Sequence, residues 1–207
     1  MHIPDGLIPI DQAVVYWAIS LVILIFFFIK LSKKGDMEKR LVISAVLAAI
    51  TIVATTFTIP SPIGIPMHFF IIPLVVIILG PYNAALISFL SLLLQSFAFG
   101  MGGVTTLGIN VLDMGIILSI VVYAVYKLFV SINKRFAIFI STVTGIIAAT
   151  FAQLIILVLA NTTSFEVLLG SLLPYYLMIA LIEGVINIVI IEFISKANNS
   201  ILEIETV

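Results

Sequence analysis

Cysteine is absent from the 207-residue chain, and charged residues make up only 9% of it. Without cysteine, disulfides, thiolate metal sites and cysteine nucleophiles are all excluded. A soluble domain carries about 25% charged residues, so this chain has too few polar side chains to cover a surface in water. Hydrophobic residues make up 63% of the sequence, and the mean hydropathy is +1.37. The composition therefore predicts a protein embedded in a lipid bilayer.

Several functional motifs are missing as well. The sequence has no G-x-x-x-x-G-K-[ST] phosphate loop and no H-E-x-x-H motif, which argues against ATP hydrolysis by that loop and against that class of zinc hydrolase. No serine–histidine constellation supplies a nucleophile and its base. No patch of basic and aromatic residues favours nucleic-acid binding. We therefore expect a protein that is not an enzyme.

Long apolar stretches predict an all-α membrane protein, a single bundle of about seven transmembrane helices that fills residues 1–207 as one integral-membrane domain. The third stretch is short, and it is either a re-entrant hairpin or a span that begins within "IPSPIGIP". The stretches are Gln12–Ile29, Leu41–Thr58, Phe69–Leu79, Ala84–Phe99, Leu107–Tyr126, Phe136–Ala160 and Ser171–Ser195.

Positive charge sets the orientation of this bundle. With seven crossings, every lysine and arginine falls on one side of the membrane, which must be the cytoplasmic side. The N-terminus is then outside and the C-terminus is cytoplasmic, as expected of a multi-pass protein of the cell membrane. The residues concerned are Lys30, Lys33, Lys34, Lys39, Arg40, Lys127, Lys134, Arg135 and Lys196.

The same topology brings the two histidines of the chain, His2 and His68, to the outer face. The amine of Met1, the backbone nitrogen of His2 and the His2 imidazole form two fused chelate rings around a cation, and His68 can supply a fourth nitrogen. A planar set of four nitrogens suits Ni(II), Cu(II) or low-spin Co(II) and suits Mg or Ca poorly. Residues 1–11 are therefore expected to be an external metal-binding segment. The alternative is that both histidines are ordinary residues at a terminus and at an interface.

The turn residues of "MHIPDG" support this interpretation. Proline at the second and glycine at the fourth turn position favour a turn around Pro4–Asp5–Gly6, which folds the terminus back onto the bundle. A bulky His2 is also expected to discourage removal of Met1, so that the amine stays in place.

Two acids, Asp113 and Glu183, fall inside predicted spans, where carboxylates are costly and usually face the protein interior. They are therefore protonated, hydrogen-bonded to nearby amides or placed near a bound cation, and are either structural acids or groups on the path of the metal. Candidates for contacts behind the ligands or along that path are Asp5, Gln95, Asn110, Asp113 and Glu183, with Gln153 and Asn187 as further amide partners. Separately, Ala45 and Ala49 form a small-xxx-small face that predicts close contact with another helix, within the chain or in another subunit.

Several motifs together resemble one known family. "MHIPDG", the histidine of "GIPMHFF", "LGPYNAAL", "LLQSFAFGMGGVTTLGINVLDMG" and "IEGVIN" are similar to the cobalt/nickel substrate-binding subunits of energy-coupling-factor (ECF) transporters, the CbiM/NikM family. The likeness extends from Met1 to about Asn187. It implies a metal held by Met1, His2 and His68. The chain departs from the family at Met101, where an acid is common, and at Asn187, where a threonine is common.

The resemblance also implies partners: a transmembrane coupling subunit, a pair of cytoplasmic ATPases and often a small accessory membrane subunit. The function expected from the sequence is thus capture of Co²⁺ or Ni²⁺ at the outer face, as the transported substrate, for uptake driven by separate ATPases. The alternatives are a membrane-embedded enzyme that uses Asp113 and Glu183 as acid and base, and an accessory assembly protein. The sequence does not distinguish cobalt from nickel, because both accept the same four nitrogens.

Overall fold

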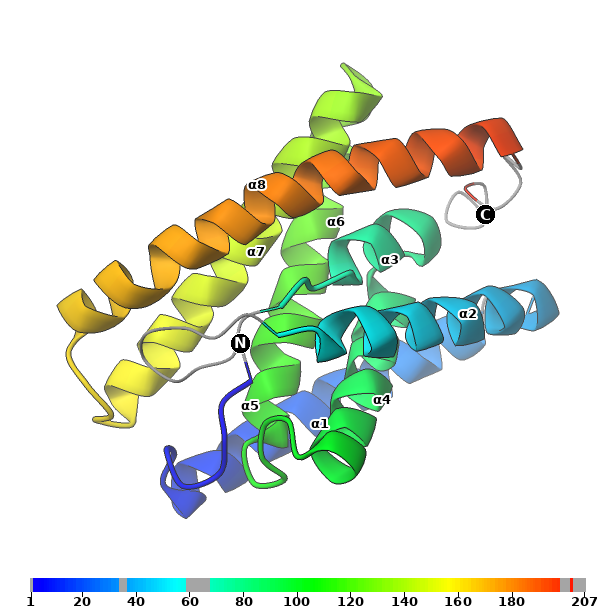
Figure 1. The fold of residues 1–207 in the computed structure, drawn as a ribbon. Coiled ribbons are helices and arrows are strands. Elements are labelled where there is room, and N and C mark those ends of the chain that lie inside the picture. Colours follow the sequence, from blue (N-terminus) through cyan, green and yellow to red (C-terminus); the bar gives the residue numbers. More distant parts are fainter. Residues whose placement is uncertain (1, 34–36, 59–67, 198–201, 203–207) are drawn as a thin grey trace.

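The chain folds into a bundle of α-helices, shown by a computed structural model that describes residues 2–33, 37–58, 68–197 and 202 (Figure 1). No β-strand occurs among these residues, which confirms the all-α prediction. Met1 and the loop "IPSPIGIP" lie outside the described residues. The long helices are α1 Ile10–Ser32, α2 Met37–Thr56, α4 Pro81–Phe99, α7 Lys134–Leu159 and α8 Phe165–Ala197.

A further long helix is continuous but changes its winding. It consists of α5 Leu107–Val111, the π-helical turns η1 Leu112–Ile117 and α6 Leu118–Phe129. Together with the five long helices above, it makes six helices in the described parts of the chain that are long and apolar enough to cross a membrane. The chain is a multi-pass membrane protein.

The short helix α3, Ile72–Leu79, corresponds to the third apolar stretch. All eight of its residues are buried, and at about 1.5 Å per residue it is too short to cross a bilayer as a helix. It runs through the interior between neighbouring helices, packed mainly on α4 and α6. The sequence therefore predicted an apolar segment here correctly, but it did not predict that protein, not lipid, surrounds that segment.

Close packing between α1 and α5 fixes the end of the bundle that matters most for function. A Cβ atom at Gly108 would come within 2.6 Å of the Trp17 backbone, so only glycine allows this approach. The Ser20 hydroxyl donates a hydrogen bond of 2.6 Å to the Gly108 carbonyl. The Trp17 indole donates one of 3.1 Å to the carbonyl of Val104, in the loop before α5. The first half of α1, the start of α5 and the loop before it are therefore held together as one corner.

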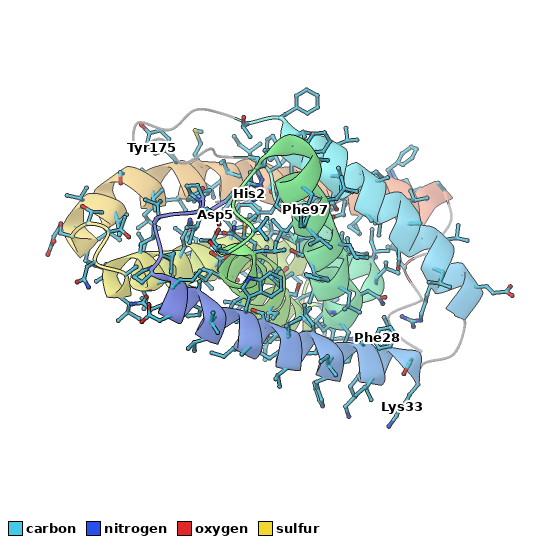
Figure 2. The ribbon with its side chains drawn as sticks, turned by 90° about the horizontal axis from the view of Figure 1, so that it is seen from below. His2, Asp5, Phe28, Lys33, Phe97 and Tyr175 are labelled. Atoms are coloured by element: carbon cyan, nitrogen blue, oxygen red, sulfur yellow. The ribbon has the colours of Figure 1, made fainter. Side chains whose placement is uncertain are left out.

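Three segments that are distant in sequence meet beside this corner: the amino-terminal segment, the loop between α4 and α5, and the residues just before α3 (Figure 1). Figure 2 shows His2 within the molecule, whereas Lys33 points away from it at the far end of α1. The side chains of His2 and Ile3 are buried, and Gly6 has a left-handed φ of 89°. The predicted turn back onto the bundle is confirmed.

Candidate metal-binding site

The backbone of Ile3 is held by two side chains of the α5 region. Its N–H donates to Asn110 Oδ1 at 2.8 Å, and its carbonyl accepts hydrogen bonds from Asn110 Nδ2 at 3.1 Å and from Thr106 Oγ1 at 2.6 Å. An amide side chain that pairs with both backbone groups of one residue fixes its position and its direction. Asn110 thus sets where the neighbouring His2 lies.

Asp5 makes the second attachment of the amino-terminal segment. Its carboxylate accepts hydrogen bonds from the backbone N–H groups of Val104 (3.0 Å), Thr105 (2.9 Å) and Thr106 (3.3 Å), just before α5. Burial alone would raise the pKa of Asp5, but hydrogen bonds from the Thr105 hydroxyl and from these backbone groups lower the pKa below its ordinary value. The acid in "MHIPDG" therefore anchors the segment and leaves metal coordination to other groups.

Two glycines allow this docking. Gly102 has φ of 78°, and a Cβ there would lie 3.3 Å from His2 Cβ and 3.5 Å from His2 Nδ1. A Cβ at Gly103 would overlap the Asp5 carboxylate and approach the Asp5 backbone nitrogen to 2.5 Å. The paired glycines of "GMGGVTT" are thus needed for close approach of the amino-terminal segment. In the sequence, these glycines were recognised only as part of a motif that resembles the CbiM/NikM family.

His2 and His68 lie next to each other. Their ring centroids are 4.7 Å apart and the rings are tilted by 35°, and each residue is 1% exposed. His68 Nδ1 lies 2.7 Å from the carbonyl oxygen of Phe69. Because a carbonyl only accepts, this nitrogen carries the proton, and the lone pair is on Nε2.

The remaining ring nitrogens are free to bind a ligand. His68 Nε2 and both ring nitrogens of His2 are buried without a hydrogen-bond partner in the described part of the chain. Buried polar atoms are nearly always paired, so unpaired ones call for an explanation such as an ion. The arrangement thus brings two imidazoles with unpaired nitrogens together from distant segments.

Glu183 positions the His68 segment in the way that Asp5 positions the His2 segment. Its carboxylate oxygens accept the N–H groups of Phe70 and Ile71, each at 2.8 Å, at the start of α3. A carboxylate at a helix N-terminus satisfies free donors and is favoured by the helix dipole. Side-chain amides were one of the partners that the sequence offered for Glu183, and the structure shows backbone N–H groups in their place.

The other polar residues predicted for the site, Asp113, Gln95 and Asn187, bond to groups other than the two histidines. One carboxylate oxygen of Asp113 accepts the Met114 N–H at 2.6 Å, and the second has no partner among the described residues. Gln95 donates to the Thr55 hydroxyl and lines a small cavity beside His68. Asn187 donates to Thr142 at 3.1 Å. No hydrogen bond joins these three residues to either histidine within the described segments.

Both histidines are neutral when docked. Burial lowers the pKa of His2 to about 3, and burial lowers the pKa of His68 well below its ordinary value. A histidine released to water takes up a proton near pH 6.5. The docked form is therefore fully stable above about pH 6.5 and loses stability as the pH falls from there towards 3.

This pH dependence can be measured with the one tryptophan of the chain. We expect the fluorescence of Trp17 to change as metal-free protein is taken from pH 7 to pH 5. The Trp17 indole donates a hydrogen bond to Val104, in the loop between α4 and α5 that holds the amino-terminal segment. The double variant His2→Ala with His68→Ala should show a flatter profile. Identical profiles for the two proteins would mean that the histidines do not control docking.

The geometry defines a class of protein: a multi-pass helical membrane protein with a buried histidine pair at one end of its bundle. The sequence profile of CbiM, described as "Cobalt uptake substrate-specific transmembrane region", matches residues 2–201. The chain belongs to this family. The resemblance noted from its motifs is thereby confirmed.

Known proteins similar to the chain include a relative from Archaeoglobus fulgidus named a putative fused nickel transport protein, NikMN. It is 33% identical over 98% of this chain and 68% of its own length. A crystal structure of a transition metal transporter is 28% identical, with a TM-score of 0.89 over 96% of this chain and 94% of the other. The S component of a bacterial ECF transporter has a TM-score of 0.58 at 19% identity, over 78% and 98% of the two chains. This last likeness concerns the fold alone.

Proposed function

We propose that the chain is the substrate-binding subunit of an ECF-type transporter and captures Co²⁺ or Ni²⁺ at the outer face of the cell membrane. The observation that carries this proposal is the pair of buried imidazoles 4.7 Å apart with unpaired nitrogens. The ligands are the Met1 amine, the backbone nitrogen and imidazole of His2, and the His68 imidazole. Four nitrogens in one plane suit both ions.

The alternative of a membrane enzyme has less support. Both oxygens of Glu183 already accept backbone N–H groups, so this acid is committed to holding the start of α3. Asp113 makes no hydrogen bond to Glu183 or to a histidine among the described residues. An accessory assembly protein, in turn, has no use for two buried imidazoles that face each other.

Metal content decides between these functions. The purified chain, with a free amino terminus and any tag placed after Val207, should hold about one Co²⁺ or Ni²⁺ per chain, a ratio that a four-nitrogen set requires. An enzyme of the Asp113–Glu183 type or an accessory protein should hold none. Titration with each ion in turn also shows which of the two the site prefers.

The proposal includes partners, because the chain carries no phosphate loop of its own. A coupling subunit in the membrane and two cytoplasmic ATPases would supply the energy, and a small accessory membrane subunit completes the expected set. The family membership and the fold shared with an ECF S component support this assembly.

Seven crossings, with the N-terminus outside and the C-terminus inside, remain part of the proposal. The loop after α4 contacts His2, so Gly80 and the start of α4 lie at the opposite end of the bundle from the histidines. This position supports a segment from His68 to Gly80 that runs from one end to the other, partly extended and partly as α3. Irregular backbone is tolerated at membrane depth where protein surrounds it.

A reporter experiment tests this topology. A reporter fused after Val207 should read cytoplasmic, and one inserted between Asn161 and Thr163 should read external. The reason is that the basic residues gather on one side only when the third segment crosses. A cytoplasmic signal from the Asn161 loop would show that residues 68–80 return to the side from which they entered.

The face of α2 that carries Ala45 and Ala49 is the proposed contact with the coupling subunit. Both alanines are exposed on the bundle, where another helix can approach closely. Ala45→Leu combined with Ala49→Leu should leave metal binding intact and abolish uptake into cells. Ala18→Leu, at an exposed alanine of α1, is the control. Normal uptake by the α2 variant would exclude this face as the contact.

A further inference from the structure

A cavity of about 540 Å³ lies between α7 and α8, where α7 begins and α8 ends. This volume falls within the range of about 300–1,000 Å³ that small-molecule sites occupy. The two helices follow each other in the chain and pack against each other (Figure 1). The lining includes four charged side chains and two buried isoleucines, which are Lys134, Arg135, Glu192, Lys196, Ile138 and Ile191.

This cavity lies at the far end of the bundle from the histidine pair. The turn after α7 is close to the amino-terminal segment, because the Thr162 hydroxyl donates to the Leu7 carbonyl at 3.4 Å. Lys134 begins α7 and Leu159 ends it, so the cavity is about 35 Å away from that turn at 1.5 Å per residue. It shares no residue with the candidate metal site and is a separate feature of the molecule.

Positive charge is in excess in this cavity. Lys134, Arg135 and Lys196 are cationic, whereas Glu192 is the one acid that the described residues contribute to the lining. Glu192 is already paired with Arg135. Neither lysine forms an ion pair with an acid in the described part of the chain. The two ammonium groups are therefore available to an anion from outside the chain.

The apolar neighbours of these charges indicate that the anion is amphiphilic. Phe136 follows Arg135 and is 48% exposed, and Phe193 follows Glu192 and is 72% exposed. Lysine and arginine side chains at the ends of membrane-spanning helices reach the level of the lipid headgroups. Exposed phenylalanines beside them lie where the acyl chains begin. The same two helix ends thus offer cations to a phosphate group and apolar side chains to the acyl chains attached to it.

We propose that this cavity binds the phosphate group of an anionic phospholipid, with Lys134 and Lys196 as its cationic partners. Basic pockets between transmembrane helices bind anionic lipid headgroups in this way. A soluble phosphate carries the same charge, but it has no acyl chains to contact the exposed phenylalanines. The site does not depend on the proposed function, so protein without Co²⁺ or Ni²⁺ should bind the lipid equally well.

Lys134→Gln combined with Lys196→Gln tests the site, with Lys30→Gln combined with Lys33→Gln as the matched control. The control removes the same charge from the end of α1, where Lys33 points away from the molecule (Figure 2). Purified metal-free chain in detergent is titrated with a short-chain phosphatidylglycerol, and native mass spectrometry measures the fraction of chains that hold one lipid. Each lysine near anionic lipid contributes about a fivefold factor, so the cavity variant should bind at least about tenfold more weakly than the control. Phosphatidylcholine, which has no net charge, should bind equally to both variants.

Glu192→Gln should change the affinity in the opposite direction. This variant removes a carboxylate from the lining and releases Arg135 from its ion pair, so phosphatidylglycerol should bind about fivefold more tightly. Lys134→Arg combined with Lys196→Arg keeps both charges and should bind like the original chain. These two results do not require the glutamine variant of the lysines to fold. Weaker binding by Glu192→Gln would contradict an anion site.

A competition experiment identifies the source of the phosphate. Glycerol phosphate carries the same phosphate group without acyl chains, and at equal concentration it should not displace phosphatidylglycerol from the chain. Displacement would overturn the lipid site in favour of a soluble phosphate. Equal lipid affinity in the cavity variant and its control would also overturn it. If the cavity variant alone then failed to co-purify with the coupling subunit, the basic residues would form a contact between proteins.

Discussion

Adding Gly-Ser before Met1 is expected to abolish high-affinity binding of Co²⁺ and Ni²⁺. The α-amine would become an amide nitrogen, and both chelate rings at the amino terminus would change. Removal of a residue that only supports a ligand costs about 10–100-fold in metal affinity, so loss of a ligand should cost at least as much. The variants His2→Ala and His68→Ala should lose affinity for Co²⁺ and Ni²⁺ to a similar extent. The measurement is metal content and calorimetric affinity of the purified chain.

The same two residues added after Val207 provide the control, because they lengthen the chain without touching the amine. The Trp17 fluorescence of each variant should match that of the original protein, which shows that the corner between α1 and α5 is intact. Unchanged affinity in the amino-terminally extended protein would exclude the amine as a ligand. The site would then be an ordinary pair of imidazoles, which such an extension leaves in place.

Much of this architecture could be predicted from the sequence, because a helix that crosses lipid must be apolar along most of its length. Apolar stretches predicted the six long helices to within a few residues at most ends, as for Gln12–Ile29 within α1. The shared sidedness of His2 and His68 followed from charge alone, and the structure places their rings side by side. The short third stretch was different, because burial in protein and burial in lipid select the same apolar residues.

Asp5 and Glu183 were among the residues expected behind the ligands, but the groups that they bind could not be predicted in the same way. Asp5 binds backbone N–H groups about a hundred positions away, and Glu183 does so over more than a hundred. Since nearly every residue carries a backbone N–H, the sequence contains no mark of which one an acid will meet. Gly103 presents the same difficulty, because its requirement comes from the neighbouring Asp5 and not from a special backbone angle.

These contacts show a common principle in the two halves of the site. Each histidine sits on a segment without regular structure, and a carboxylate holds each segment in place. Asp5 of the His2 segment accepts an N–H group just before α5, and Glu183 of α8 accepts an N–H group of the His68 segment just before α3. A side chain on a flexible segment loses much entropy when it binds a metal, and anchoring it beforehand reduces that cost. We therefore expect the acids to increase metal affinity without touching the metal.

Gly103→Ala is expected to remove this preorganisation at the amino terminus. The new methyl group would occupy the place of the Asp5 carboxylate and press on its backbone nitrogen, so the segment that carries His2 must move away from the loop. Metal affinity should fall about 10–100-fold, the range seen when a supporting group is lost. Asp5→Ala should have an effect of the same order, because it removes the three backbone hydrogen bonds directly.

Gly170→Ala is the matched control for this variant. Gly170 lies in α8 with open space where a methyl group would be added, and alanine is a better helix residue than glycine. Calorimetry on both purified variants should therefore show weak binding for Gly103→Ala and normal binding for Gly170→Ala. Equal, normal affinities would mean that His2 reaches the metal without the attachment of Asp5 to the loop, and that the terminus is organised by Asn110 and Thr106 alone.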